Sequence, residues 1–234
     1  MSILQSQKRL LLVGASRGLG YAMAEEFLRR RWNVVGTVRA QAHTRLHELA
    51  EKSAGRIEIE TLDITLPDQI SALRSRLAAT TFDILFVNAG VTNNPQETIG
   101  EVSTEEFVRV MVTNALSPMR VVEALYNLVA PDGTVGVMSS GQGSVSNNTG
   151  GKREVYRASK AALNTLMRSF AARHVADRRA MVLMAPGWVR TDLGGPDGRL
   201  SIEESVPNVV DTLLAAGGAP GLRYLDYLGR AVPW

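Results

Sequence analysis

The chain has 234 residues, of which 45% are hydrophobic and 6% aromatic, and it contains no cysteine. This length and composition suffice for one well-packed core, and the lack of thiols excludes disulfides, cysteine nucleophiles and thiolate metal sites. A net charge of +3, without a basic stripe, argues against nucleic-acid binding. The apolar runs are too short for a membrane span or a signal-peptide core, so we expect a cytoplasmic protein without a membrane partner.

Seven short apolar segments alternate along the chain with segments of helical periodicity. We predict strands at residues 9–13, 33–38, 56–62, 82–87, 133–138, 179–185 and 222–228. Strands that alternate with helices favour a parallel sheet covered on both faces. We therefore predict an α/β fold over residues 1–234, a single doubly wound Rossmann-like domain with sheet order 3-2-1-4-5-6-7. The glycine-rich segment at 193–205 is expected to be a short substrate lid.

The longest predicted helical region covers residues 99–129. Ser103 and Glu106 near its start are typical of a capping box. Asn114 lies inside the region, and Pro118, four residues later, has no N–H for the Asn114 carbonyl. We expect a kink here and a carbonyl that is free to hold a water, although a surface asparagine before a proline kink explains the pattern equally well.

Polar residues or glycines follow nearly every predicted strand at its carboxyl end, which is where open α/β sheets bind ligands. They are the turn 14–20, Arg39, Asp63, the tripeptide Asn88-Ala89-Gly90, Ser139 with Ser140, and the segment 186–192. This arrangement predicts a ligand cleft along one edge of the sheet.

The first of these segments has three glycines, Gly14, Gly18 and Gly20, between a strand and a helix. Their backbone N–H groups and the helix dipole could bind a pyrophosphate. The spacing is G-x-x-x-G-x-G and differs from the G-x-G-x-x-G fingerprint, so a tight structural turn is the alternative.

Tyr156 and Lys160 lie four residues apart in a predicted helix over 155–175 and therefore share one of its faces. A nearby ammonium favours the phenolate and lowers the pKa of a tyrosine, which makes it a usable general acid and base. An exposed tyrosine and lysine on a helix surface is the alternative. His43 and His47 have the spacing of a metal pair, but nothing completes a ligand set, and we expect no metal.

Five motifs occur in order between Leu10 and Thr191: G-x-x-x-G-x-G, N-A-G, a serine after the fifth strand, Y-x-x-x-K and P-G-x-V-x-T. Together they resemble the short-chain dehydrogenase/reductase family. The loop 143–151, the segment P-G-W-V-R-T-D-L-G-G and the ending P-W are most similar to the sniffer and C-factor branch of its carbonyl reductases.

The resemblance implies catalytic roles for four residues. Tyr156 would protonate the substrate carbonyl, and Lys160 would lower its pKa and hold the nicotinamide ribose. Ser140 would polarise the carbonyl, with Ser139 as the alternative serine. Asn114 would hold a water that links Lys160 to solvent.

The resemblance also implies a dinucleotide site. Its residues would be Gly14, Ser16, Arg17, Gly18, Leu19 and Gly20 in the turn; Asp63 and Ile64 at the adenine; Asn88, Ala89 and Gly90 at the ribose; and Pro186, Gly187, Val189 and Thr191 with Tyr156 and Lys160 at the nicotinamide. Three departures from the family pattern are Val13 in place of threonine, Val87 in place of the first asparagine of N-N-A-G, and a longer loop, 144–153, before Tyr156.

Arg39 ends the second strand, where an NAD enzyme has an acid. Arg17 lies in the glycine turn, and two guanidiniums suit a 2′-phosphate, although both could be solvent arginines. We therefore predict an NADP(H)-dependent oxidoreductase that reduces a ketone or aldehyde. The alternatives are an NAD-linked secondary alcohol or diol dehydrogenase and a non-catalytic NADP(H)-sensing or signalling protein. The resemblance leaves a homodimer or homotetramer open.

Overall fold

Seven parallel strands form one sheet in the order β3-β2-β1-β4-β5-β6-β7, which confirms the predicted order. The computed structural model describes residues 7–39 and 42–234. Residues 1–6 lie outside the described residues. They are the start of the expected 1–234 domain and of the stretch that was considered as a signal peptide. The strands are β1 (Arg9–Val13), β2 (Asn33–Val38), β3 (Ile57–Thr61), β4 (Phe82–Val87), β5 (Val129–Met138), β6 (Ala180–Ala185) and β7 (Gly221–Asp226).

β5 begins four residues before the predicted start. Val129 pairs with Phe82, and the register shifts before Ile84 pairs with Thr134. The intervening Pro131, Asp132 and Gly133 are typical of a turn, so the sequence did not indicate a strand here. The irregular pairing accommodates these residues within the strand.

Seven α-helices connect the strands within residues 7–39 and 42–234. They are α1 (Gly18–Arg29), α2 (Arg45–Glu51), α3 (Pro67–Arg76), α4 (Thr104–Met111), α5 (Ser117–Leu125), α6 (Glu154–Arg173) and α7 (Ile202–Ala216). A π-helical turn, Val112–Leu116, joins α4 to α5. Within the described residues, no helix has both the length and the apolar character needed to cross a membrane.

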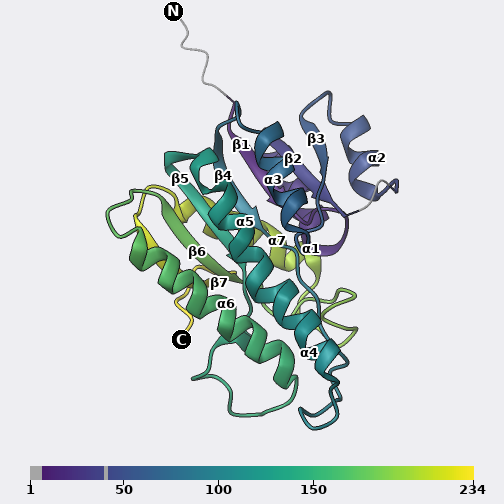
Figure 1. The fold of residues 1–234 in the computed structure, drawn as a ribbon. Coiled ribbons are helices and arrows are strands. Elements are labelled where there is room, and N and C mark those ends of the chain that lie inside the picture. The colour runs from purple at the N-terminus through teal and green to yellow at the C-terminus, as the bar shows by residue number, and fades with distance from the viewer. Residues whose placement is uncertain (1–6, 40–41) are drawn as a thin grey trace, which may run out of the picture.

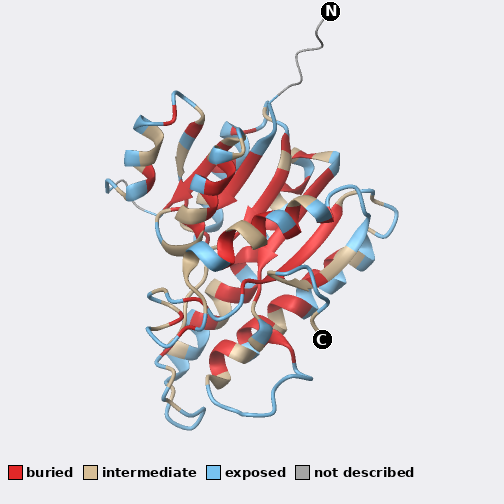
Figure 2. Ribbon diagram, turned by 180° about the vertical axis from the view of Figure 1, so that it is seen from behind, coloured by how far each residue is buried: buried red, intermediate tan, exposed pale blue. Residues whose placement is uncertain are grey.

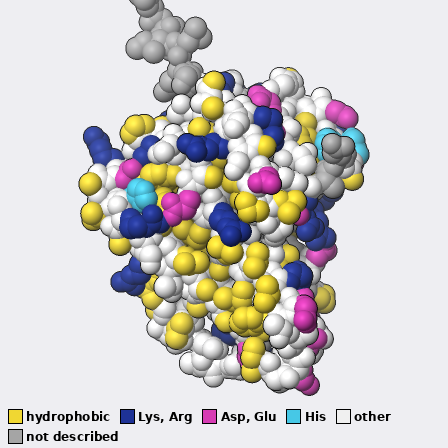
Figure 3. Space-filling model, in the orientation of Figure 1, with side chains coloured by type: hydrophobic (Ala, Val, Ile, Leu, Met, Phe, Trp, Pro, Cys, Tyr) yellow, Lys and Arg dark blue, Asp and Glu magenta, His cyan; other side chains and the backbone are white. Residues whose placement is uncertain are grey.

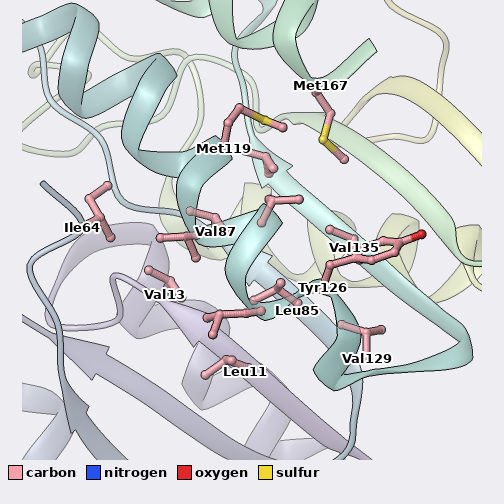
Figure 4. Close-up of a cluster of buried hydrophobic side chains, with 14 of the residues drawn as sticks. Leu11, Val13, Ile64, Leu85, Val87, Met119, Tyr126, Val129, Val135 and Met167 are labelled. Carbon is pink, nitrogen blue, oxygen red and sulfur yellow. The ribbon is translucent and has the colours of Figure 1, made fainter. Parts of the chain in front are cut away.

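The helices cover both faces of the sheet, as Figure 1 shows. Side chains of α3, α5 and α6 pack against one face, and side chains of α1, α2 and α7 pack against the other. Figure 4 shows the first layer, in which Leu11 and Leu85 of the strands lie below Met119 of α5 and Met167 of α6. The central strands are buried almost throughout (Figure 2), as expected for apolar runs covered on two sides.

Two details differ from the sequence-based expectations. The Ser103 hydroxyl accepts a hydrogen bond from the Glu106 N–H at 3.2 Å, but the Glu106 carboxylate binds Arg109 instead of completing a capping box. Helix α7 begins at Ile202, so the last residues of the expected lid, 202–205, form its first turn. The segment 193–201 has no helix of its own.

Candidate active site

A cavity of about 900 Å³ opens at the carboxyl ends of the strands. Every residue assigned to the site from the sequence lines it except Gly20 and Asn114. The cavity therefore brings together residues from all six strand exits, as the edge rule for parallel sheets predicts.

The three glycines of the first turn have different roles. Gly14 has φ +89°, and a Cβ there would lie 2.8 Å from the Ala89 nitrogen. A Cβ on Gly20 would lie 2.0 Å from the Gly14 carbonyl oxygen, so both glycines are required by close packing. Gly18, the first residue of α1, has φ +56° and nothing within 4 Å of its Cβ position. It leaves the backbone of the helix N-terminus open to the cavity.

The turn is braced by residues from two neighbouring strands. The Gly14 N–H donates to the Thr37 hydroxyl of β2 at 3.0 Å. The Asn88 side-chain amide donates to the Gly14 carbonyl at 2.8 Å. Thr37 therefore supplies a hydroxyl next to the position where Val13 lacks one. This role of Thr37 could not be predicted from the sequence, because a threonine inside an apolar strand is common in any sheet.

Two arginines line the same end of the cavity. Arg17 is the residue before α1, and its guanidinium donates to the Asp192 carboxylate at 2.8 Å. Arg39 follows β2 and is exposed, and no ion pair of its side chain occurs among residues 7–39 and 42–234. Asp63 lines the cavity nearby, with its carboxylate accepting hydrogen bonds from the Thr65 N–H at 2.8 Å and hydroxyl at 2.6 Å.

Tyr156 and Lys160 share a face of α6 and are 6% and 3% exposed. The Lys160 ammonium donates to the Met138 carbonyl at 2.9 Å and lies 5.9 Å from the centre of the Tyr156 ring. Burial lowers the pKa of Lys160 to about 8. Burial raises the pKa of Tyr156, while the Ser140 hydroxyl and the Arg153 charge act in the opposite direction. The pair is therefore buried, unlike a tyrosine and a lysine on a helix surface. The pKa of Tyr156 is raised by this burial, where the sequence led us to expect a pKa lowered by the neighbouring ammonium.

The two serines after β5 differ in their partners. The Ser139 hydroxyl donates to the Asn164 side-chain oxygen at 2.6 Å, and the residue is buried. The Ser140 hydroxyl accepts a hydrogen bond from the Gln142 N–H at 3.1 Å, and its carbonyl accepts one from the Tyr224 hydroxyl. The Ser140 hydroxyl also favours a lower pKa of Tyr156. A Cβ on Gly143 would lie 2.9 Å from the Asn164 amide, so the S-x-x-G spacing fits close packing against α6.

Asn114 lies behind the cavity, in the π-helical turn. Its amide donates to the Val91 carbonyl at 2.8 Å and to the Ser159 hydroxyl at 3.0 Å, and its side-chain oxygen accepts from the Val91 N–H at 2.8 Å. The side chain thus ties the end of the N-A-G segment to α6. The expected break in the helix appears as a π turn, a feature often found at functional sites. The water at the Asn114 carbonyl stays a prediction.

The segment after β6 also lines the cavity. Its Gly187 has φ +85°, and the Ser205 hydroxyl of α7 donates to the Pro186 carbonyl at 2.7 Å. The Thr191 hydroxyl accepts from the Gly194 N–H at 3.0 Å. Val189 is buried and also lines the cavity.

Trp234 forms hydrogen bonds with the loop 144–153 beside the cavity, a contact that the sequence did not indicate. The Ser146 N–H and hydroxyl both donate to the Trp234 carbonyl, at 3.0 and 2.6 Å. The Trp234 ring lies 5.5 Å from the ring of Tyr224, which also contacts Ser140. The loop 144–153 is therefore anchored to the chain end on one side and to α6 on the other.

Comparisons with known proteins show the family to which the chain belongs. The model of a family described as enoyl-(acyl carrier protein) reductase matches residues 14–206. A structure from Burkholderia multivorans, described as a short-chain dehydrogenase/reductase with bound NADP, is 66% identical and has a TM-score of 0.96. The alignment covers 97% of this chain and 100% of that one. The chain belongs to the short-chain dehydrogenase/reductase family.

Two further relatives confirm the resemblance to the sniffer and C-factor branch. The C-signal protein of Myxococcus xanthus is 36% identical over 65% of this chain and 92% of its own length. The carbonyl reductase Sniffer of D. melanogaster is 26% identical, with a TM-score of 0.88 over 97% of this chain and 100% of that one. A short-chain dehydrogenase/reductase is an oxidoreductase, and this chain shares that general activity class.

Proposed function

We propose that this oxidoreductase is an NADP(H)-dependent carbonyl reductase that reduces a ketone or an aldehyde to the alcohol. The observation that carries the proposal is the buried pair of Tyr156 and Lys160, which lines the cavity beside Ser140. Together these residues offer the groups needed to reduce a carbonyl. The phenol can protonate the carbonyl oxygen, the hydroxyl can polarise it, and the ammonium can stabilise the phenolate that forms.

The residues of the cavity fit NADP(H). Gly18 leaves open space at the start of α1, where the helix dipole favours a pyrophosphate. Arg17 and Arg39 line the same end and present two forks for a 2′-phosphate. Asp63 and Ile64 would contact the adenine, residues 88–90 the ribose, and residues 186–191 the nicotinamide. The bound NADP of the Burkholderia multivorans structure supports this assignment.

When bound, the reduced nicotinamide supplies a hydride to the carbonyl carbon. Tyr156 donates its phenolic proton to the carbonyl oxygen, so that one hydride and one proton give the alcohol. Ser140 donates a hydrogen bond to the same oxygen and holds it in place. The Lys160 charge stabilises the phenolate that remains, and Asn114 fixes the backbone at Val91 that forms the wall behind this pair.

The first test is cofactor and substrate preference. We expect consumption of NADPH with members of a panel of aldehydes, ketones, quinones and diketones, and a preference over NADH of at least tenfold in kcat/KM, or about 1.4 kcal/mol. The preference should fall in Arg39→Gln, whereas Arg31→Gln, an exposed arginine before the same strand, should keep it. Equal efficiency with both cofactors would favour the NAD-linked alcohol dehydrogenase instead.

A signalling role is the second candidate, favoured by the relative named C-signal. Such a protein would use the cofactor site to control a partner and would not need Tyr156. A Tyr156→Phe strain separates the two candidates, because a catalytic function is lost with the phenol. If the cellular function persists in that strain, the result supports the signalling role over the catalytic one.

We also propose that the protein forms a homodimer or homotetramer. Exposed apolar side chains gather over α4 and α6 in Figure 3, and they include Phe107, Val108, Leu116 and Leu166. Contiguous apolar patches of this kind are typical of protein interfaces. Light scattering on the purified protein should give a mass of two or four chains, and Phe107→Glu with Leu166→Glu should lower it.

A further inference from the structure

The wall of the cavity contains three arginines that the site assignments above do not use. Arg109, Arg153 and Arg230 all line it. Arg109 is bound to Glu106 at 2.7 Å, and Arg230 is bound to Asp226 at 2.7 Å. The side chain of Arg153 has no ion pair and no hydrogen bond within residues 7–39 and 42–234.

The carboxylates near Arg153 have other partners. Glu154, its neighbour in the chain, accepts a hydrogen bond from the Ile99 N–H at 2.6 Å. The acids that line the cavity are Asp63, Asp192 and Asp226, and they bind Thr65, Arg17 and Arg230. The Arg153 guanidinium therefore adds a positive charge to the cavity that none of these acids balances.

The backbone holds Arg153 in an unusual conformation. Lys152 and Arg153 have φ values of +61° and +55°, in the left-handed region that non-glycine residues rarely adopt. Arg153 also occupies the position before α6, where its cation opposes the helix dipole and its side chain caps no backbone group. Strain of this kind persists where the surroundings enforce it, often beside ligands.

The position of Arg153 relative to the reacting groups is set by α6. Arg153 precedes the first turn of the helix, and Tyr156 lies in that turn, so both face the same part of the cavity. The positive charge of Arg153 also opposes the rise in the pKa of Tyr156 that burial causes. A group bound by Arg153 would therefore belong to the same small molecule whose carbonyl oxygen meets Tyr156.

We propose that the substrate is an oxoacid, a carbonyl compound whose carboxylate is bound by the guanidinium of Arg153. This inference rests on the proposed carbonyl reduction and adds the substrate class. A planar carboxylate matches the guanidinium fork and gives charge-assisted hydrogen bonds, which are stronger than neutral ones. Arg153 is the residue that selects this substrate class.

The chain offers a matched pair of variants for the test. Lys152 and Arg153 are adjacent cations with the same left-handed backbone, but only Arg153 lines the cavity. Asparagine tolerates this conformation, so Arg153→Asn and Lys152→Asn each remove one charge with little added strain. 4-Oxopentanoate and its methyl ester are the first substrate pair, followed by longer oxoacids with their esters.

We expect the wild type to prefer the acid over its ester by at least tenfold in kcat/KM, mainly through KM. In Arg153→Asn, kcat/KM for the acid should fall at least tenfold further than kcat/KM for the ester, while Lys152→Asn should match the wild type with both substrates. An equal loss for acid and ester would show that Arg153 acts only on Tyr156, and this would overturn the proposal, as would no loss in Arg153→Asn.

A binding measurement separates this inference from the proposed function. Calorimetry with cofactor-free protein should show 4-oxopentanoate binding to the wild type and to Lys152→Asn, and weaker binding to Arg153→Asn by about tenfold. If no acid or ester is reduced but binding follows this pattern, the reductase proposal fails and the carboxylate site stands. If esters are reduced but acids neither bind better nor react faster, the carboxylate site is wrong.

Discussion

Arg17 and Asp192 form an ion pair of 2.8 Å between two loops that both line the cavity. The two residues are far apart in the chain, one in the glycine turn and one after β6. Both side chains are well exposed, at 71% and 78%. In the proposed complex, the Asp192 carboxylate and the 2′-phosphate of NADPH would compete for the Arg17 guanidinium.

Replacement of Asp192 by asparagine should therefore strengthen NADPH binding. An exposed ion pair contributes about 0–1 kcal/mol, so we expect a Kd for NADPH up to about fivefold lower and an unchanged Kd for NADH. Fluorescence titration measures both constants. Asp197→Asn removes an exposed acid from the same loop, outside the cavity, and is the matched control. Weaker or unchanged NADPH binding in Asp192→Asn would argue against competition for Arg17.

Thr37 should matter for both stability and cofactor binding, because it accepts the Gly14 N–H at 3.0 Å. Thr37→Val keeps the shape but leaves this N–H without its partner, at a cost of about 1–3 kcal/mol. Urea unfolding should show this loss, and NADPH binding should weaken because the glycine turn is no longer braced. Thr37→Ser should restore both, and a Thr37→Val protein as stable as the wild type would show that the bond is dispensable.

The strands and the location of the site followed from the sequence because both are local properties. The apolar, β-branched runs of β1, β2 and β4 end where predicted, and each is followed by a glycine or polar residue at the ligand edge. The parallel sheet then brings those ends together, so the cavity could be expected before its shape was known.

The contacts that the sequence did not indicate are those between distant segments. Three hydrogen bonds depend on how the elements pack against one another. They join Thr37 to Gly14, Ser139 to Asn164, and Ser146 to Trp234. The placement of the Arg153 side chain depends on the left-handed backbone conformation of Lys152 and Arg153. This conformation is rare for lysine and arginine, so the sequence does not predict it. Such features follow from the tertiary structure as a whole.

Lys160 should make the wild type less stable at neutral pH than a variant with an apolar side chain. Its pKa is lowered by burial from 10.5 to about 8, so the folded protein holds an unfavourably buried charge below pH 8. Lys160→Met should raise the free energy of unfolding at pH 7 by on the order of 1–3 kcal/mol while it abolishes reduction.

The pH dependence of this difference has a definite sign. Between about pH 8 and 10.5, the folded wild type has lost the Lys160 proton and the unfolded chain still holds it. The wild type therefore gains stability relative to Lys160→Met as the pH rises through this range, and the gap is constant below pH 8. Urea unfolding of cofactor-free protein at pH 7 and pH 10 measures it, and an equal gap at both pH values would contradict a charged, buried lysine.

The most direct test of the account compares Tyr156→Phe with the wild type in carbonyl reduction and in NADPH binding, on the same purified proteins. Removal of one hydroxyl deletes the proton donor and leaves the ring, the cavity and the cofactor contacts in place. We expect kcat to fall by at least about a hundredfold while the Kd for NADPH changes by less than about threefold. Full activity in Tyr156→Phe, with the same substrate, would contradict the assignment of Tyr156 as the acid that protonates the carbonyl.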